Sequence, residues 1–175
     1  MSKLLRLSGF AVLVHCVLLG AAVAETKDDD AYTALRTELV EDVAHSIRQT
    51  HAETYVEKLS KRLLQAIRDV PRDAFVTPQL RPYAYFDVPL PVRLDQNISQ
   101  PSLIALMIEL ADIKETDVVF ETGTGAGYQA AVLSKLAEQI FSVEVVVPLA
   151  RRAQSLIAEM SYENERIRHA DGFYG

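Results

Sequence analysis

Residues 118–127 read VVFETGTGAG, and this stretch decides the fold. Its first half is a short apolar run that ends in an acid, which is typical of a buried parallel strand. Its second half carries Gly123, Gly125 and Gly127, which let the backbone turn sharply and approach a ligand without a Cβ atom in the way. The helical pattern that follows offers free N–H groups and the positive end of its dipole. The stretch therefore predicts a strand, a ligand-binding loop and a helix in succession.

The same alternation continues toward the C-terminus. Strands are expected at 117–121, 140–144 and 166–170, and helices are expected at 128–137 and 148–160. Strands that alternate with helices form a parallel sheet, because each helix carries the chain back to the same end of the sheet. The sequence therefore predicts an α/β fold of the doubly wound, Rossmann-like type.

The part of the chain before residue 117 has a different sequence pattern. Apolar residues at helical spacing predict helices over 31–49 and 56–69. Prolines recur through 71–101 and exclude one long helix, so short extended pieces and turns are expected there. A helix over 100–111, apolar on more than one face, is expected to be buried, with Ser99 as its N-cap.

The first segment has the marks of an export signal. Lys3 and Arg6 precede an uncharged apolar run that ends Ala22-Val23-Ala24. A basic start, an apolar middle and an A-x-A ending are typical of a secretory signal peptide. We therefore expect a signal peptide over 1–24 and a periplasmic or secreted protein with no stable membrane association after cleavage. An uncleaved membrane anchor is the alternative, and a misassigned start would leave the protein in the cytoplasm.

Composition excludes several classes of protein. The 175 residues suffice for one domain, and 18 Lys+Arg against 24 Asp+Glu give a formal charge of −6, which disfavours a nucleic-acid partner. The single cysteine, Cys16, lies in the signal-like segment and cannot form an internal disulfide. The four histidines do not cluster at metal-ligand spacing, so no metal site is expected.

The glycine loop distinguishes between two kinds of cofactor. A dinucleotide fingerprint would place its third glycine at position 128, which is Tyr128 here. The spacing is instead E-x-G-x-G-x-G beginning at Glu121, the loop associated with S-adenosylmethionine-dependent methyltransferases. Glu144 ends the next expected strand, where a carboxylate can accept both hydroxyls of a ribose. The alternatives are a tight turn with no ligand and a solvated acid at a strand end.

Several stretches resemble the protein-L-isoaspartate (D-aspartate) O-methyltransferase family. They are VPRDAFV at 70–76, YAYFDVPLP at 83–91, QNISQP at 96–101, and the segment 121–133, which ends GYQAAVL. The terminal pair Asp171-Gly172 also matches. The resemblance covers roughly residues 34–175 and implies the fold of a methyltransferase that uses S-adenosylmethionine.

The resemblance also implies roles for individual residues. Ser99 would be the active-site serine, and Asp95 and Asn97 depart from the glycine and threonine usual in the family. The residues expected to hold S-adenosylmethionine are Glu121, Gly123, Gly125, Gly127, Glu144, Asp171 and Gly172. The implied reaction methylates the α-carboxyl of L-isoaspartyl and D-aspartyl residues in damaged proteins, which begins their repair. We also expect a monomer.

The resemblance divides the chain after the signal into two further segments. Residues 25–100 would form an N-terminal helical and proline-rich segment, and residues 101–175 the first half of the cofactor-binding domain. Because the family's fold continues through further strands and helices, we expect a sheet incomplete at its C-terminus and a fragment or prematurely terminated product. Two alternatives stay open, a non-catalytic truncated remnant and a methyltransferase acting on a different small carboxylic acid.

Overall fold

The computed structural model describes residues 32–92, 94 and 96–174. The chain divides into two compact units, Met1–Leu35 and Arg36–Gly175, and the elements discussed below belong to the second. The expected signal peptide over 1–24 and the departure at Asp95 lie outside the described residues.

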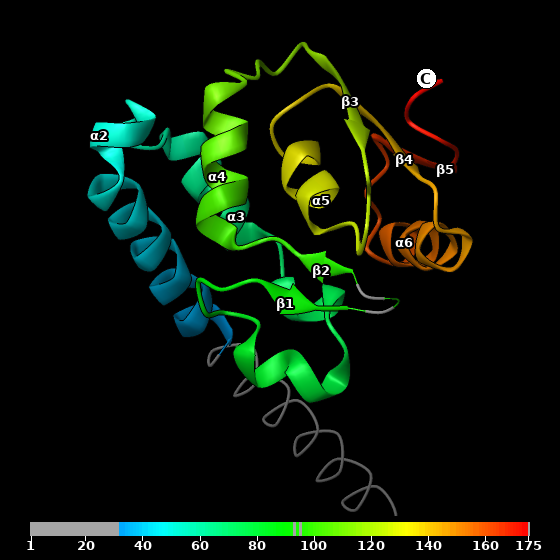
Figure 1. Cartoon of the computed structure of the whole chain (residues 1–175), viewed down its shortest axis with the longest axis horizontal. Coiled ribbons are helices and arrows are strands. Elements are labelled where there is room, and N and C mark those ends of the chain that lie inside the picture. Colours follow the sequence, from blue (N-terminus) through cyan, green and yellow to red (C-terminus); the bar gives the residue numbers. More distant parts are fainter. Residues whose placement is uncertain (1–31, 93, 95, 175) are drawn as a thin grey trace, which may run out of the picture. The chain divides into compact units, whose positions relative to one another are not determined.

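A parallel sheet organises the second unit (Figure 1). Within the described residues it has three strands in the order β3-β4-β5, which are Val118–Thr122, Gln139–Glu144 and Glu165–His169. Helices α5 (Tyr128–Ser134) and α6 (Val147–Glu159) connect them in turn. Both ladders are parallel, as the strand–helix alternation predicts. The predicted α/β sheet is therefore confirmed.

The two faces of this sheet differ in polarity and cover. Helices α5 and α6 contact β4 and β5. Ile140 and Ser142 point to one face of β4 and are 0% and 1% exposed. On the other face Phe120 and Phe141, which pair across the β3–β4 ladder, are 51% and 41% exposed. The helices therefore cover the face that carries Ile140 and Ser142.

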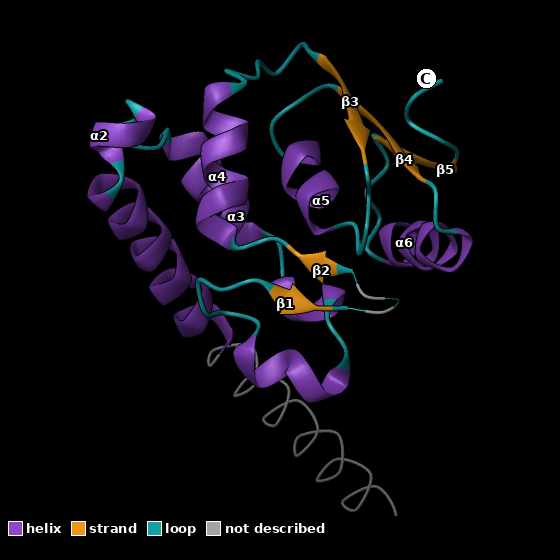
Figure 2. Ribbon diagram, viewed as in Figure 1, coloured by secondary structure: helices purple, strands orange, loops and turns teal. Residues whose placement is uncertain are grey.

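Helices and turns precede the sheet (Figure 2). Residues 36–49 are helical, and the elements that follow are α2 (His51–Thr54), α3 (Lys61–Asp69), the 3₁₀ turns η1 (Arg72–Phe75) and η2 (Pro78–Tyr83), the hairpin β1 (Leu90–Pro91) and β2 (Asn97–Ile98), and α4 (Pro101–Leu110). Helix α3 contacts both α4 and α5. The prediction of short pieces and turns across the proline-rich segment is confirmed.

Two helical predictions need correction. The helix expected over 56–69 begins at Lys61, because Tyr55 adopts a left-handed φ of 58° and Ser60 caps the later start by accepting a hydrogen bond from the backbone of Leu63. The helix expected to be buried on several faces is α4, and its Leu103 and Leu110 are 48% and 61% exposed. Tertiary packing covers one stripe of this largely apolar helix and leaves another stripe in contact with water.

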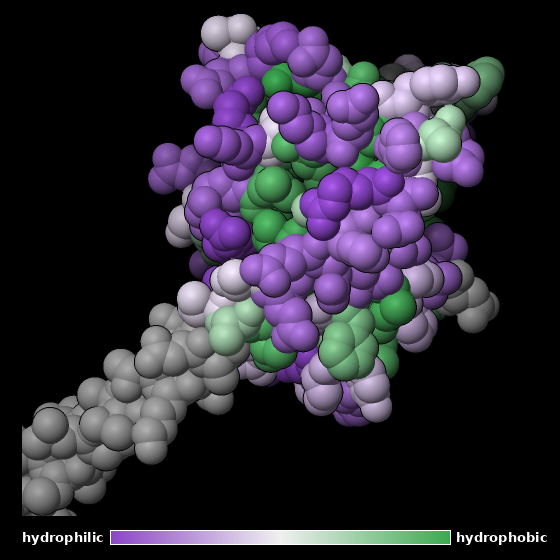
Figure 3. Space-filling view, turned by 90° about the vertical axis from the view of Figure 1, so that its left-hand side faces the viewer, coloured by the Kyte–Doolittle hydropathy of each residue, from purple (hydrophilic) through white to green (hydrophobic). Residues whose placement is uncertain are grey.

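One face of the molecule is largely hydrophilic. On the face shown in Figure 3, hydrophilic side chains predominate and hydrophobic ones gather in patches between them. In the part of the chain that the structure describes, no helix combines the length and apolar character needed to cross a membrane.

Candidate functional site

The glycine loop between β3 and α5 has a backbone conformation that favours glycine. Gly123, Gly125 and Gly127 have φ values of 82°, 58° and 93°. This left-handed region costs an L-residue roughly 1–2 kcal/mol. A Cβ atom added at Gly123 would meet nothing within 4 Å, and one at Gly125 would meet its nearest neighbour at 3.9 Å. The loop therefore leaves open space beside its backbone, as a ligand cradle requires.

Glu121 is linked to the loop through a pair of hydroxyl groups. The Ser142 hydroxyl donates to a Glu121 carboxylate oxygen at 2.5 Å, and the Ser142 and Thr124 hydroxyl oxygens lie 2.5 Å apart. Burial raises the pKa of Glu121 to about 7, although hydrogen bonds from Ser142 and Gln129 act in the opposite direction. The nearby Glu144 carboxylate adds a smaller rise. Glu121 is thus a buried carboxyl group that titrates near neutral pH.

Glu144 holds the middle of the loop. One carboxylate oxygen accepts the backbone N–H of Gly125 at 2.8 Å, and the other accepts the backbone N–H of Val146 at 2.8 Å. A carboxylate has about four acceptor positions, so both oxygens retain capacity for a ligand. The structure places Glu144 at the expected strand end and in contact with the loop.

Ser99 follows the hairpin and faces the same pocket as the loop. Strands β1 and β2 pair Leu90 with Ile98, and Ser99 follows directly. Ser99 lines one pocket together with Glu121, Gly123 and Gly125. Residues more than twenty positions apart in sequence thus meet at one site. Gly127 begins α5 as its N-cap at the end of the loop.

The expectation that Ser99 caps helix α4 is wrong. The N-cap is Gln100, and its side chain makes no capping hydrogen bond. Asp87 supplies the missing acceptor, because its carboxylate accepts the Ser102 backbone N–H at 2.8 Å and the Gln100 side-chain amide at 3.2 Å. No hydrogen bond of the Ser99 hydroxyl appears among the described residues, so the hydroxyl is available to the pocket.

Asp171 and Gly172 follow β5 at the same edge of the sheet. A Cβ atom at Gly172 would lie 2.7 Å from Thr122 Cγ2 and 3.3 Å from Val143 Cγ2. Glycine is therefore required there for close packing against the ends of β3 and β4. Asp171 is exposed and accepts the Phe173 backbone N–H at 2.9 Å, which shapes the turn.

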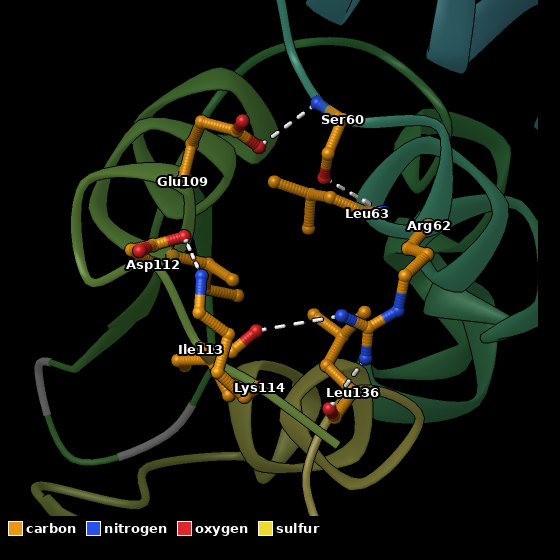
Figure 4. A pocket seen from close by; sticks show the side chains of 9 residues that line it. Ser60, Arg62, Leu63, Glu109, Asp112, Ile113, Lys114 and Leu136 are labelled. Atoms are coloured by element: carbon orange, nitrogen blue, oxygen red, sulfur yellow. Dashed lines mark hydrogen bonds and ion pairs between the residues drawn. The ribbon is translucent and has the colours of Figure 1, made fainter. Parts of the chain in front are cut away.

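A second pocket lies away from the loop (Figure 4). Arg62 crosses it and donates to the Leu136 carbonyl at 2.8 Å and to the Ile113 carbonyl at 3.5 Å. Its Nε atom lies 3.3 Å from a Glu115 carboxylate oxygen. The guanidinium is thus occupied in tying α3 to the loop before β3 and to the end of α5. Among the described residues, no group of His, Cys, Asp and Glu could hold a metal ion.

A parallel sheet with an acid-ended first strand, a three-glycine loop and a helix start at that loop defines the Rossmann-like fold of S-adenosylmethionine-dependent methyltransferases. Residues 41–175 match the family model described as protein-L-isoaspartate(D-aspartate) O-methyltransferase. The chain belongs to this family.

Curated relatives support the assignment. Protein-L-isoaspartate O-methyltransferase 2 of Nitrosococcus oceani is 43% identical over 119 residues, which are 68% of this chain and 54% of that protein. The Syntrophobacter fumaroxidans protein of the same name is 35% identical over 164 residues, which are 94% of this chain and 66% of that protein. The chain therefore spans between about half and two thirds of the length of these relatives.

Solved structures agree on the fold. A protein-L-isoaspartate O-methyltransferase superposes with a TM-score of 0.66 at 27% identity, covering 80% of this chain and 43% of that one. A putative enzyme of the same name from Plasmodium falciparum, solved with S-adenosyl-L-homocysteine, has a TM-score of 0.58 at 16% identity and covers 75% of this chain and 63% of that one.

Several residues of the site carry no clear signal in the sequence. Ser142 looks like a polar residue within an apolar strand, yet it bonds Glu121. Asp87 and Arg72 lie among prolines and aromatics, and their hydrogen-bond partners are at least thirteen residues away in sequence, with Ser46 before Asp87 and the others after. The alternation of residues on β4 could have indicated Ser142, since it shares a face with Ile140 and Glu144.

Proposed function

We propose that this protein transfers a methyl group from S-adenosylmethionine to the α-carboxyl of L-isoaspartyl and D-aspartyl residues in damaged proteins. The observation that carries the proposal is that Ser99 lines the same pocket as Glu121, Gly123 and Gly125. A loop suited to the cofactor and a hydroxyl suited to the acceptor are thereby side by side.

The residues present fit the cofactor. Open space beside Gly123 and Gly125 leaves room for a ligand against the loop backbone. The carboxylates of Glu121 and Glu144 suit a cofactor that carries an ammonium group and ribose hydroxyls. We assign the loop glycines, Glu121, Glu144 and the Asp171-Gly172 turn to cofactor binding. When bound, S-adenosylmethionine supplies an electrophilic methyl group on a sulfonium.

The chemistry asks little of the protein beyond alignment. An α-carboxyl group has a pKa of about 4 or below and is ionised at neutral pH, so the acceptor needs no general base. The Ser99 hydroxyl can donate a hydrogen bond to one carboxylate oxygen and leave the other free to react. Holding the reacting atoms in line then provides most of the rate increase.

The proposal is tested by methyl transfer to a defined peptide. The unchanged chain is incubated with methyl-labelled S-adenosylmethionine and a peptide containing L-isoaspartate, and the matched peptide with normal aspartate is the control. Label in the isoaspartyl peptide alone, reduced at least about tenfold by Ser99→Ala, supports the proposal. Absence of both methyl transfer and calorimetric binding of S-adenosylhomocysteine would support the non-catalytic alternative. Transfer to a free small acid but not to the peptide would support the other alternative.

We also propose that the protein acts after export, as a monomer and without nucleic-acid or membrane partners. The basic, apolar and A-x-A pattern of residues 1–24 supports export, and the formal charge of −6 argues against a nucleic-acid partner. Mass spectrometry of the exported protein should find a chain that begins at Glu25. An intact chain from Met1 in the membrane fraction would instead indicate the anchor.

A further inference from the structure

Arg72 joins the chain segment before the β1–β2 hairpin to the segment after it, close to the candidate site. It lies in η1 and is 0% exposed. Its Nη2 atom donates to the Val88 carbonyl at 3.1 Å and to the Ser99 carbonyl at 3.2 Å. One nitrogen therefore fixes the backbone on both sides of the hairpin that presents Ser99.

The same side chain contacts the other half of the site. Its guanidinium carbon lies 5.2 Å from the centroid of the Tyr128 ring, which is a cation–π distance. Tyr128 is the first residue of α5 and directly follows Gly127. Phe75, also in η1, packs its ring edge-on against Tyr128 with centroids 5.6 Å apart. Arg72 is thus in contact with the start of the helix that ends the glycine loop.

Packing alone does not account for a guanidinium at this position. Arg72 Nε and Nη1 are buried without hydrogen-bond partners among the described residues. Burial lowers the pKa of Arg72, while Tyr128 and Asp87 act in the opposite direction. An apolar side chain of similar length would fill the space without this desolvation cost. What the guanidinium adds is its two carbonyl bonds and its contact with the ring.

We infer that Arg72 is a positioning residue, which sets the Ser99 segment at a fixed distance from the glycine loop. The inference rests on the proposed methyl transfer. Arg72 itself is fully buried and does not line the pocket of Ser99, so it acts through the Ser99 backbone and the Tyr128 ring. Because reaction depends on alignment, a small displacement of Ser99 should reduce turnover while the loop still binds cofactor.

The test compares Arg72→Lys and Arg72→Met with Arg62→Lys. Arg62 is the control, because it also donates to two backbone carbonyls, in the pocket of Figure 4, although its side chain is 44% exposed. Lysine keeps the charge without the planar fork, and methionine removes both charge and desolvation cost. For each variant we would measure unfolding by denaturant, calorimetric affinity for S-adenosylhomocysteine, and kcat and KM for the isoaspartyl peptide. Ser99→Ala is combined with Arg72→Lys in a double-mutant cycle.

We expect kcat to fall about 10- to 100-fold in both Arg72 variants, with S-adenosylhomocysteine affinity within about threefold of the unchanged chain. In the Ser99→Ala background, Arg72→Lys should cost little further kcat. Equal kcat losses in the Arg72 and Arg62 variants, or fully additive losses with Ser99→Ala, would overturn the inference alone. Absence of transfer by the unchanged chain would overturn the proposed function, and the positioning role with it. Should the lysine variant not fold, the methionine variant decides on the same criteria.

Discussion

The carboxylate of Glu144 accepts the backbone N–H of Gly125 at 2.8 Å, which ties the end of β4 to the middle of the glycine loop. Its second oxygen accepts the Val146 N–H, so one side chain orders the loop and the start of the next connection. The acid is therefore structural in the free protein and is also a candidate acceptor for a ligand.

Glu144→Gln should weaken cofactor binding. The amide keeps one acceptor and presents an NH₂ group to a backbone donor, so the loop loses a charge-assisted bond of about 1.5–3 kcal/mol. We expect S-adenosylhomocysteine affinity to fall roughly 10- to 100-fold by calorimetry. Glu159→Gln, at an exposed position ending α6, is the control and should bind normally. Unchanged affinity in Glu144→Gln would remove Glu144 from the site.

Gly125→Val should impair both the loop and its ligand. A β-branched residue at a φ of 58° is strained and costs about 1–3 kcal/mol, measurable by denaturant unfolding. The added side chain also occupies the open space beside the loop, so affinity for S-adenosylhomocysteine should fall at least about tenfold. Gly125→Ala shares the backbone strain with a smaller side chain. If the two variants bind equally well, the space beside Gly125 is not used by the ligand.

Glu165 should make the protein less stable as the pH rises. Both of its carboxylate oxygens are buried without partners among the described residues, and burial raises its pKa from 4.5 to about 8, with a further rise from Glu121. The unfolded chain releases this proton near pH 4.5 and the folded one near pH 8. The protonated form therefore favours the fold, and stability falls between these values and levels off above pH 8.

Glu165→Gln should remove the part of the pH dependence that Glu165 causes, while the raised pKa of Glu121 leaves a smaller dependence of the same sign. The amide is neutral at every pH, so we expect a gain of about 1–3 kcal/mol at pH 8 and little change at pH 4.5, measured by urea unfolding. Glu163→Gln, exposed and two residues earlier, should leave the profile unchanged. A Glu165→Gln profile that retains the full slope would assign the dependence to another group.

Glu121 should make binding of S-adenosylmethionine depend on pH. Its pKa is raised to about 7, so it becomes charged as the pH rises from 6 to 8. S-adenosylmethionine carries one more positive charge than S-adenosylhomocysteine, so its relative affinity should increase over this range. Calorimetry of both ligands at pH 6, 7 and 8 measures the ratio. Glu121→Gln should flatten the ratio, and an unchanged pH profile in this variant would place the titrating group elsewhere.

Much of the sheet could be predicted from the sequence, because its signals are local. The strand–loop–helix unit needs only an apolar run, three glycines and a helical pattern, and β3, the loop and α5 form where expected. Boundaries shifted by a few residues; α5, for example, ends at Ser134 rather than 137.

Local reasoning was wrong where distant residues supply the contacts. Ser99 has the sequence context of an N-cap, yet Asp87 provides the acceptor for the start of α4 from another part of the chain. The apolar residues of α4 do not reveal which stripe is covered, and Leu110 is exposed. A local capping motif or helical pattern does not show whether a residue distant in sequence will supply the capping hydrogen bond or cover one side of the helix.

The sequence by itself determined that a glycine loop opens a helix after an acid-ended strand, since glycine is the residue that adopts those backbone angles without strain. It also placed Glu144 at the end of the next strand. Tertiary structure alone decided that Arg72 bonds the Ser99 carbonyl, and that Glu165 is buried without a hydrogen-bond partner among the described residues. Each of these depends on burial and hydrogen bonds between segments that lie far apart in sequence, and these form only when the chain folds.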